Sequence, residues 1–265
     1  MAKSTTRIDG WLALAVIIAT LSTVQFAICT TLSMAAYPGG DYRDQRADAP
    51  SMGYDWNHNW LSDLGRNKTW TGKSNAVSAR YFNWSIIGLG LGLLVFFGIF
   101  HRAVDEEMIA AWFMQACGTL ASMGLIALGF TPVDLAYHFH LMALAAWVIP
   151  MPVMAIVFAY QCFRSAGFIG TAAGAIAAAM AFVLTIAILC YAAAGSPSGY
   201  VVMQKIVVAI SIIWFLLLAL RVAFATIEIV TASQLEKINL QAECYSVRLQ
   251  KGHRFRMHSG QTDKK

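Results

Sequence analysis

Charged side chains are scarce in this chain of 265 residues. Asp, Glu, Lys and Arg together make up 12% of the sequence, whereas soluble globular domains average about 25%. Hydrophobic residues make up 58%, and most of them gather in six long runs. A helix of about 20 apolar residues crosses the hydrocarbon core of a bilayer, and each run reaches about that length. This composition excludes an ordinary soluble domain and predicts a polytopic membrane protein.

Several sequence signatures are also missing. The five cysteines show no CxxC spacing, which argues against a disulfide framework and against a zinc site. The sequence contains no GxSxG, HExxH or P-loop motif, the signatures of common hydrolases and nucleotide-binding proteins. No apolar run carries a row of charges, and the last run has no lysine near its middle. Ion conduction, proton pumping and a retinal Schiff base are therefore not expected.

The runs predict an all-α fold, a six-transmembrane-helix bundle. A stub at residues 1–10 precedes the membrane domain, 11–230, and a basic tail follows at 231–265. The first run is too long for the apolar region of a signal peptide, so we expect it to be a retained helix. Pro150 and Pro152 should kink the fourth helix. The predicted spans are about 11–36, 81–100, 108–130, 139–163, 168–194 and 200–220, with a long first loop at 37–80.

The distribution of Lys and Arg predicts the orientation, because cytoplasmic loops carry an excess of both. The loops after the second and fourth spans contain Arg102 and Arg164, and those after the third and fifth contain neither residue type. We therefore expect both termini in the cytoplasm and loop 37–80 outside the plasma or bacterial inner membrane, although that loop holds six Lys and Arg residues against this rule. The basic tail should bind anionic inner-leaflet lipid, and no nucleic acid partner is expected.

Polar residues from four segments should meet at the extracytoplasmic end of the bundle. They are Asp63 in the first loop, Asn83 at the start of the second span, Asp134 with His138 before the fourth, and Lys205 early in the sixth. We take Asp63, Asn83 and Lys205 as candidate ligand-binding residues and Asp134 and His138 as candidate catalytic residues.

Each of these residues also has a structural explanation. Asp134 and Asp63 are suited to capping helices, and Lys205 to reaching the membrane interface. His140 is two positions from His138, on another helix face, so we expect it to pack or to hydrogen-bond. The spacing of Asp134, His138 and His58 is not diagnostic of a metal site, and we expect neither metal nor cofactor.

These residues lie in longer motifs of the sequence. The motifs are Pro38-Gly39-Gly40, Asn59-Trp60-Leu61-Ser62-Asp63-Leu64-Gly65, Phe82-Asn83, Gly129-Phe130-Thr131-Pro132-Val133-Asp134 with His138, and Gln204-Lys205. Together they resemble a known family, the bacterial and archaeal membrane proteins called domain of unknown function 998. The similarity covers the six spans and leaves out the tail. Lys205 stands where that family is expected to have arginine, so a bidentate contact to carboxylate or phosphate is in doubt there.

The family is distantly similar to the Frag/DRAM/Sfk group of six-span proteins, which are associated with lipid remodelling. The resemblance implies six helices and a connection to membrane lipid, but it does not imply a reaction. Three hypotheses stay open: a protein that binds or helps remodel lipid, a lipid-modifying enzyme that uses Asp134 and His138, and a structural or regulatory membrane protein.

Overall fold

The computed structural model describes residues 10–44, 51–103, 108–164, 171–193 and 197–259. Within these ranges the chain is helical and contains no strand, apart from one isolated bridge between Lys68 and Ser74. Most of the predicted stub, residues 1–9, and the last six residues of the tail, 260–265, lie outside the described part. The elements are α1 (Gly10–Ala36), η2 (Leu61–Gly65), α2 (Ala76–Gly98), η3 (Phe100–Ala103), α3 (Met108–Phe130), α4 (Tyr137–Val148), α5 (Pro150–Arg164), α6 (Thr171–Ala193) and α7 (Pro197–Ser259).

Six helical segments in the described ranges are long and apolar enough to cross a membrane. The all-α fold with six such helices confirms the predicted fold class and is consistent with a multi-pass membrane protein. Helices suit a lipid environment because they satisfy every backbone N–H and C=O group within the segment. The segments are Gly10–Ala36, Ala76–Gly98, Ile109–Phe130, Tyr137–Arg164, Thr171–Cys190 and Tyr200–Leu220.

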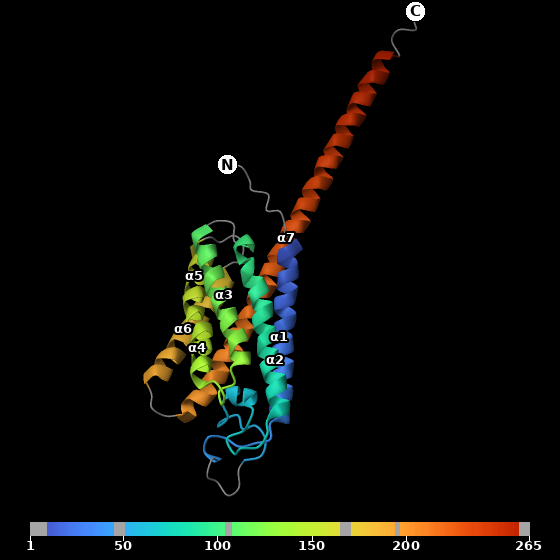
Figure 1. The fold of residues 1–265 in the computed structure, drawn as a ribbon. Coiled ribbons are helices and arrows are strands. Elements are labelled where there is room, and N and C mark those ends of the chain that lie inside the picture. The colour runs from blue at the N-terminus through green and yellow to red at the C-terminus, as the bar shows by residue number, and fades with distance from the viewer. Residues whose placement is uncertain (1–9, 45–50, 104–107, 165–170, 194–196, 260–265) are drawn as a thin grey trace, which may run out of the picture. The chain divides into compact units, whose positions relative to one another are not determined.

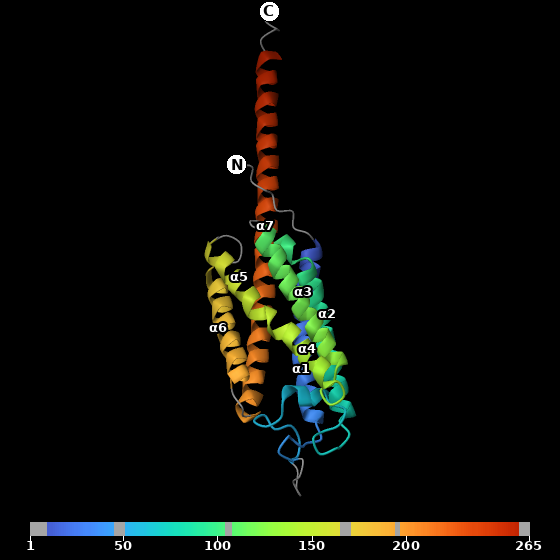
Figure 2. The same cartoon turned by 60° about the vertical axis from the view of Figure 1, so that its left-hand side comes forward.

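The fourth of these segments is two helices, α4 and α5, joined at Ile149. The break lies directly before Pro150, because a proline ring lacks the N–H that would continue the helical hydrogen bonds and crowds the preceding turn. Figure 2 shows that the two helices do not share one axis. The break therefore lets α4 pack along α3 while α5 packs along α6 (Figures 1 and 2).

Small residues allow the helices to pack closely. The hydroxyls of Ser33 in α1 and Ser78 in α2 are 2.8 Å apart and buried. A Cβ atom added at Gly90 of α2 would lie 2.9 Å from the backbone oxygen of Ser122 in α3, so this contact requires glycine. Close approach of this kind is typical of membrane helices.

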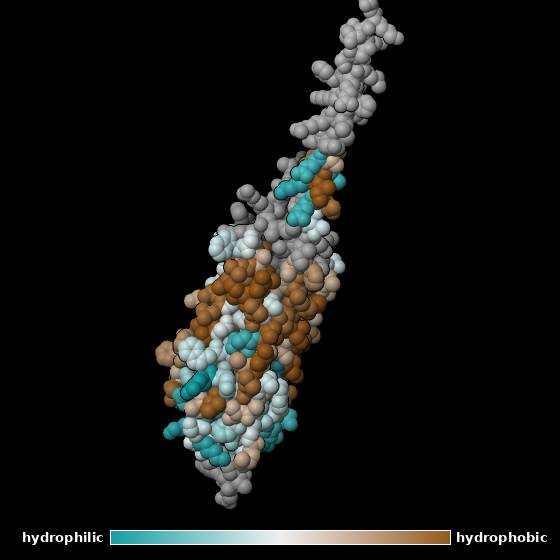
Figure 3. All heavy atoms as spheres, turned by 90° about the vertical axis from the view of Figure 1, so that its right-hand side faces the viewer, coloured by the Kyte–Doolittle hydropathy of each residue, from teal (hydrophilic) through white to brown (hydrophobic). Residues whose placement is uncertain are grey.

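The first part of α7 belongs to the core of the bundle. Phe215 contacts Phe97 of α2 with ring centroids 5.9 Å apart, and Trp214 contacts Phe158 of α5 at 6.0 Å. The face of the bundle in Figure 3 is mostly hydrophobic between its ends, and hydrophilic side chains gather over the connection between α1 and α2. This distribution is the one expected of a bundle in lipid.

Residues Asp9–Ala223 form one compact unit, and the rest of α7 belongs to another. Helix α7 continues without a break to Ser259, so the predicted domain boundary at residue 231 falls inside a helix. The side chains of Leu235, Ile238 and Leu240 in this second unit are exposed. The side chains of the basic residues after Ser246 lie outside the described part.

Candidate functional site

The α1–α2 connection, residues 37–75, folds around the buried carboxylate of Asp63. Its Oδ2 accepts hydrogen bonds from the backbone N–H of Trp60 at 2.9 Å and from the side-chain amide of Asn59 at 3.3 Å. Its Oδ1 accepts one from the indole of Trp70 at 2.9 Å. Burial raises the pKa of Asp63 to about 6 despite these donors. Asp63 thus caps η2 and holds three parts of the connection together by accepting hydrogen bonds from Asn59, Trp60 and Trp70.

A glycine turn supports the same arrangement. Gly39 and Gly40 have φ angles of 99° and 92°, which residues with a Cβ atom rarely adopt. The carbonyl oxygen of Gly40 accepts hydrogen bonds from the Tyr37 hydroxyl and the Asn59 amide, both at 2.9 Å. This turn therefore ties the end of α1 to the segment that holds Asp63.

Asn83 of α2 fastens η2 to the bundle. Its side-chain amide donates to the carbonyl oxygen of Gly65 at 3.0 Å. A Cβ atom at Gly65 would overlap Asn83 Oδ1, so a larger residue at this position would displace the Asn83 side chain. Leu61 at the other end of η2 donates its N–H to Gln204 Oε1 of α7 at 2.9 Å. The short helix η2 is therefore hydrogen-bonded to both α2 and α7 and covers one end of the bundle.

Lys205 is buried in the first turns of α7, with 6% of its surface exposed. Its ammonium group donates to the carbonyl oxygens of Trp56 at 2.7 Å, Asn59 at 2.6 Å and Val201 at 3.3 Å. No carboxylate among the described residues lies within ion-pair distance of it. The chain itself thus uses all three ammonium protons, and binding of an anionic group by Lys205 stays a prediction.

Asp134 and His138 do not interact with each other in the described part of the chain. Asp134 accepts hydrogen bonds from the backbone N–H groups of Asn67 and Lys68 at 3.0–3.2 Å, so it ties the α3–α4 connection to the α1–α2 connection. His138 is exposed, and the contact that the described residues show for its ring is with the ring of Tyr137. Their role as an acid–base pair stays a prediction, one that would require His138 to turn toward Asp134.

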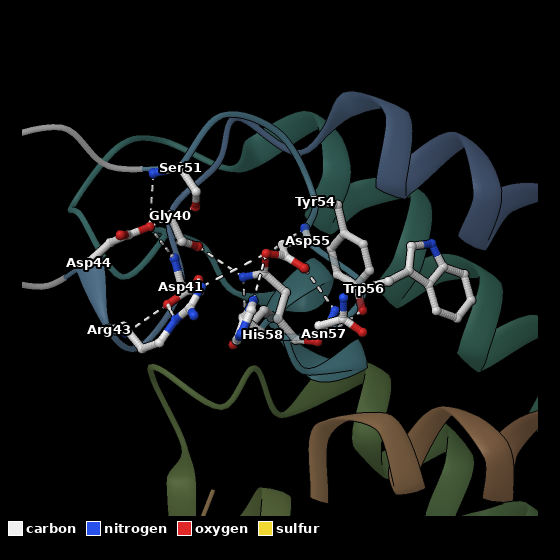
Figure 4. Close-up of polar contacts among 12 residues, drawn as sticks. Gly40, Asp41, Arg43, Asp44, Ser51, Tyr54, Asp55, Trp56, Asn57 and His58 are labelled. Atoms are coloured by element: carbon white, nitrogen blue, oxygen red, sulfur yellow. Dashed lines mark hydrogen bonds and ion pairs between the residues drawn. The ribbon is translucent and has the colours of Figure 1, made fainter. Parts of the chain in front are cut away.

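A second polar network occupies the tip of the α1–α2 connection (Figure 4). The guanidinium of Arg43 donates twice to the buried Asp41, at 3.0 and 2.7 Å, and lies 3.8 Å from Asp55. Asp55 Oδ2 lies 2.7 Å from Nδ1 of His58, and this contact holds the pKa of Asp55 below its usual value. Asp41, Asp55 and His58 each offer one atom that could bind a metal ion, and these three atoms lie within 4.8 Å of one another. The carboxylate of Asp41 is paired with Arg43, and that of Asp55 is hydrogen-bonded to His58; the absence of a metal here stays a prediction.

A cavity opens beneath η2 in the interior of the bundle. Side chains from α1, η2, α2, α3, α4 and α7 line it, and the space that it encloses is about 40 Å³. Most of the lining is apolar, with a few polar side chains. The lining has the composition of a small-molecule site, but the enclosed space is well below the ~300–1,000 Å³ of such sites, so in this conformation only a small part of a ligand enters it. Asn83 is the one predicted site residue that lines this cavity.

Two polar side chains in the cavity lining belong to α4. Trp147 is 7% exposed, and its buried indole N–H has no hydrogen-bond partner among the described residues. His140 is 8% exposed and its Nδ1 lies 2.7 Å from the carbonyl oxygen of Thr131. Sequence reasoning gave Trp147 no role and His140 only a packing or hydrogen-bonding one. Their seven-residue spacing, which puts both on one helix face, is the signal that could have paired them.

No family model, curated protein or solved structure matches this chain.

Proposed function

We propose that this protein is a multi-pass membrane protein that binds lipid, or helps remodel it, through the cavity beneath η2. The observation that carries the proposal is the cavity itself, an apolar space between membrane-length helices that contains a few polar side chains. A lipid has the matching chemistry, because its chain suits the apolar walls and its polar head suits the groups near η2.

The proposed orientation follows the distribution of Lys and Arg. Both termini would lie in the cytoplasm, and the α1–α2 connection would cover the extracytoplasmic end. The basic residues in the last part of α7 would then face anionic lipid of the inner leaflet. The resemblance to the domain of unknown function 998 family supports the connection to lipid by analogy, and membership of that family is part of this proposal.

The test blocks the cavity without altering the surface of the bundle. Ile212 of α7 lines the cavity, whereas the next residue, Ile213, is 56% exposed. We expect Ile212→Trp to fill the space and remove lipid that co-purifies with the protein in mild detergent. Ile213→Trp adds the same ring outside the cavity and serves as the matched control. Native mass spectrometry measures the lipid bound per protein.

Equal lipid occupancy in wild type, Ile212→Trp and Ile213→Trp would contradict the proposal. Loss of folded protein in Ile212→Trp would make occupancy uninformative for that variant, so Val208→Phe provides a smaller obstruction at another lining position. The proposal requires at least one folded cavity variant to lose lipid while Ile213→Trp keeps it.

A lipid-modifying enzyme is the second candidate, and the pair of Asp55 and His58 favours it. Because a carboxylate only accepts, Nδ1 of His58 donates to Asp55, which leaves Nε2 to take a proton from water or a hydroxyl group. Loss of lipid turnover in His58→Asn, with binding retained, would support this candidate.

A further inference from the structure

We infer that a basic surface at the start of α2 binds the phosphate groups of anionic phospholipid in the leaflet at the η2 end of the bundle. The basic surface consists of Arg66, Lys68, Lys73 and Arg80, which lie in the second part of the α1–α2 connection and the first turns of α2. This inference goes beyond the proposed function, because it assigns a lipid contact outside the cavity. It depends on three features: cations without an ion pair, an apolar helix face beside them, and aromatic rings at the same level.

Charge is distributed unevenly along the α1–α2 connection. All five of its aspartates precede Arg66, whereas residues 66–80 contain two Lys, two Arg and no acid. In the first part of the connection, Arg43 forms an ion pair with Asp41 at 2.7 Å. No side chain of the basic surface lies within ion-pair distance of a carboxylate among the residues that the structure describes. The counter-charge of these cations therefore comes from dissolved ions or from a binding partner.

A short hairpin holds Lys68 close to the start of α2. Lys68 forms a backbone bridge with Ser74, two residues before the helix begins. The backbone N–H of Asn75 donates to the carbonyl oxygen of Asn67 at 2.9 Å and closes the hairpin. Arg80 follows the first residue of α2 by about one helical turn, or about 6 Å along the axis. The exposed residues Lys68 and Arg80 thus belong to the same end of α2.

Arg80 lies on the exposed face of α2 and is the one charged residue of that helix. Val77, Trp84 and Leu91 share this face, because successive members of the set Val77, Arg80, Trp84 and Leu91 are three, four and seven positions apart. The three apolar side chains are exposed, and α2 is long and apolar enough to cross a membrane. The face that carries Arg80 is therefore suited to contact with lipid.

Aromatic rings indicate the level of the membrane interface on this face. Tyr81 and Trp84 are both exposed, and such rings gather where the hydrocarbon meets the headgroups. Arg80 directly precedes Tyr81, so its long stem can place the guanidinium among the headgroup phosphates. Arginine binds phosphate through two parallel hydrogen bonds, and lysine binds it as a point charge.

An anionic phospholipid matches both parts of this arrangement. Its phosphate supplies the missing counter-charge, and its acyl chains pack along the apolar face of α2. A dissolved anion would use the cations alone and would gain nothing from the exposed rings. The inference also gives a role to the Lys and Arg residues of the α1–α2 connection, whose number runs against the usual distribution of charge between loops.

The experiment compares three ligands with the full-length protein in an uncharged detergent. They are phosphatidylglycerol, phosphatidylcholine with the same acyl chains, and soluble glycerol 1-phosphate. Native mass spectrometry measures the affinity for each ligand. We expect phosphatidylglycerol to bind more tightly than phosphatidylcholine, and glycerol 1-phosphate to show no measurable binding. The preference for phosphatidylglycerol should shrink as salt is added, because salt screens exposed charges.

Two double variants test the assigned residues. Lys68→Gln combined with Arg80→Gln should lower the preference for phosphatidylglycerol about fivefold for each charge removed. Lys68→Arg combined with Arg80→Lys keeps both charges and should keep the preference. Neither side chain forms a hydrogen bond or ion pair within the described part of the chain, so we expect wild-type unfolding temperatures. Arg66 is left unchanged because its guanidinium lies 4.1 Å from the ring centre of Trp70.

The basic tail is the same in every variant, so differences between them report on the basic surface. An unchanged preference in the neutral double variant, or an equal loss in the charge-preserving one, would overturn the inference. Binding of glycerol 1-phosphate as tightly as the lipid would also overturn it, because the surface would then take a dissolved anion.

The cavity variant Ile212→Trp separates this inference from the proposed function. We expect it to keep the preference for phosphatidylglycerol, whether or not it loses co-purified lipid. Loss of the preference in Ile212→Trp, with Ile213→Trp unaffected, would place the anionic lipid in the cavity and overturn the assignment to the basic surface.

Discussion

The ammonium group of Lys205 in α7 lies 2.6 Å from the carbonyl oxygen of Asn59, 146 positions earlier in the chain. Asn59 also donates from its side chain to Asp63 at 3.3 Å. One residue thereby links a buried lysine of the bundle to the buried carboxylate that organises the α1–α2 connection. Lys205 and Asp63, which the sequence analysis predicts to bind a ligand, are therefore linked through Asn59 rather than by a direct ion pair.

Replacing Lys205 with methionine should destabilise the fold by about 2–4 kcal/mol, because it leaves the carbonyl oxygens of Trp56 and Asn59 without their charged donor. Unfolding in detergent, followed by tryptophan fluorescence, measures the change. Lys73→Met, at an exposed position of the same connection, is the control. If Lys205→Met keeps wild-type stability but loses anionic lipid, Lys205 is a ligand-binding residue after all.

Asp63 should make stability depend on pH in a defined window. Its folded-state pKa of about 6 lies above the ordinary aspartate pKa of 3.8, so the folded chain binds more protons between these values. Stability from this group therefore rises as pH falls from about 6 to 4, at about 1.4 kcal/mol for each unit of pKa difference. Asp44 and Asp55 have lowered pKa values, and their contribution is lost only at lower pH.

The variant Asp63→Asn isolates this effect. The amide cannot titrate and satisfies fewer of the three N–H donors, so we expect lower stability at pH 7 and a flatter profile between pH 6 and 4. Thermal unfolding of both proteins across this range provides the comparison. A wild-type profile that falls on acidification through the same window would contradict the raised pKa of Asp63.

Asp134 and His138 should differ in their effect when changed. Asp134→Ala removes the acceptor for two backbone N–H groups, and because the site is partly exposed we expect a loss of about 1 kcal/mol. His138→Ala should change stability by less than about 0.5 kcal/mol. Chemical unfolding measures both. Loss of lipid turnover in His138→Ala, with His140→Ala still active, would instead support the predicted acid–base pair.

The predicted convergence of polar segments is partly visible in the structure. Asp134 meets the backbone of Asn67 and Lys68, and Gln204 and Lys205 meet the segment that runs from Trp56 to Leu61. The topology predicts these contacts, because the loops after the first, third and fifth spans lie at the same end of a six-helix bundle. Which atoms meet was not foreseeable, because Lys205 could equally have reached a carboxylate or the membrane interface.

The sequence by itself determined the helices, since long apolar runs in lipid have few ways to satisfy their backbone other than α-helix. It also determined the break before Pro150, which follows from the chemistry of one ring. Only the tertiary structure decided that Asp63 lies buried among three donors, that Asn83 lies against Gly65, and that the buried N–H of Trp147 has no partner among the described residues. The donors to Asp63 lie at most seven positions away, and Gly65 lies 18 positions from Asn83. These contacts depend on how the connection folds onto the bundle, and a local sequence pattern does not specify which atoms then meet.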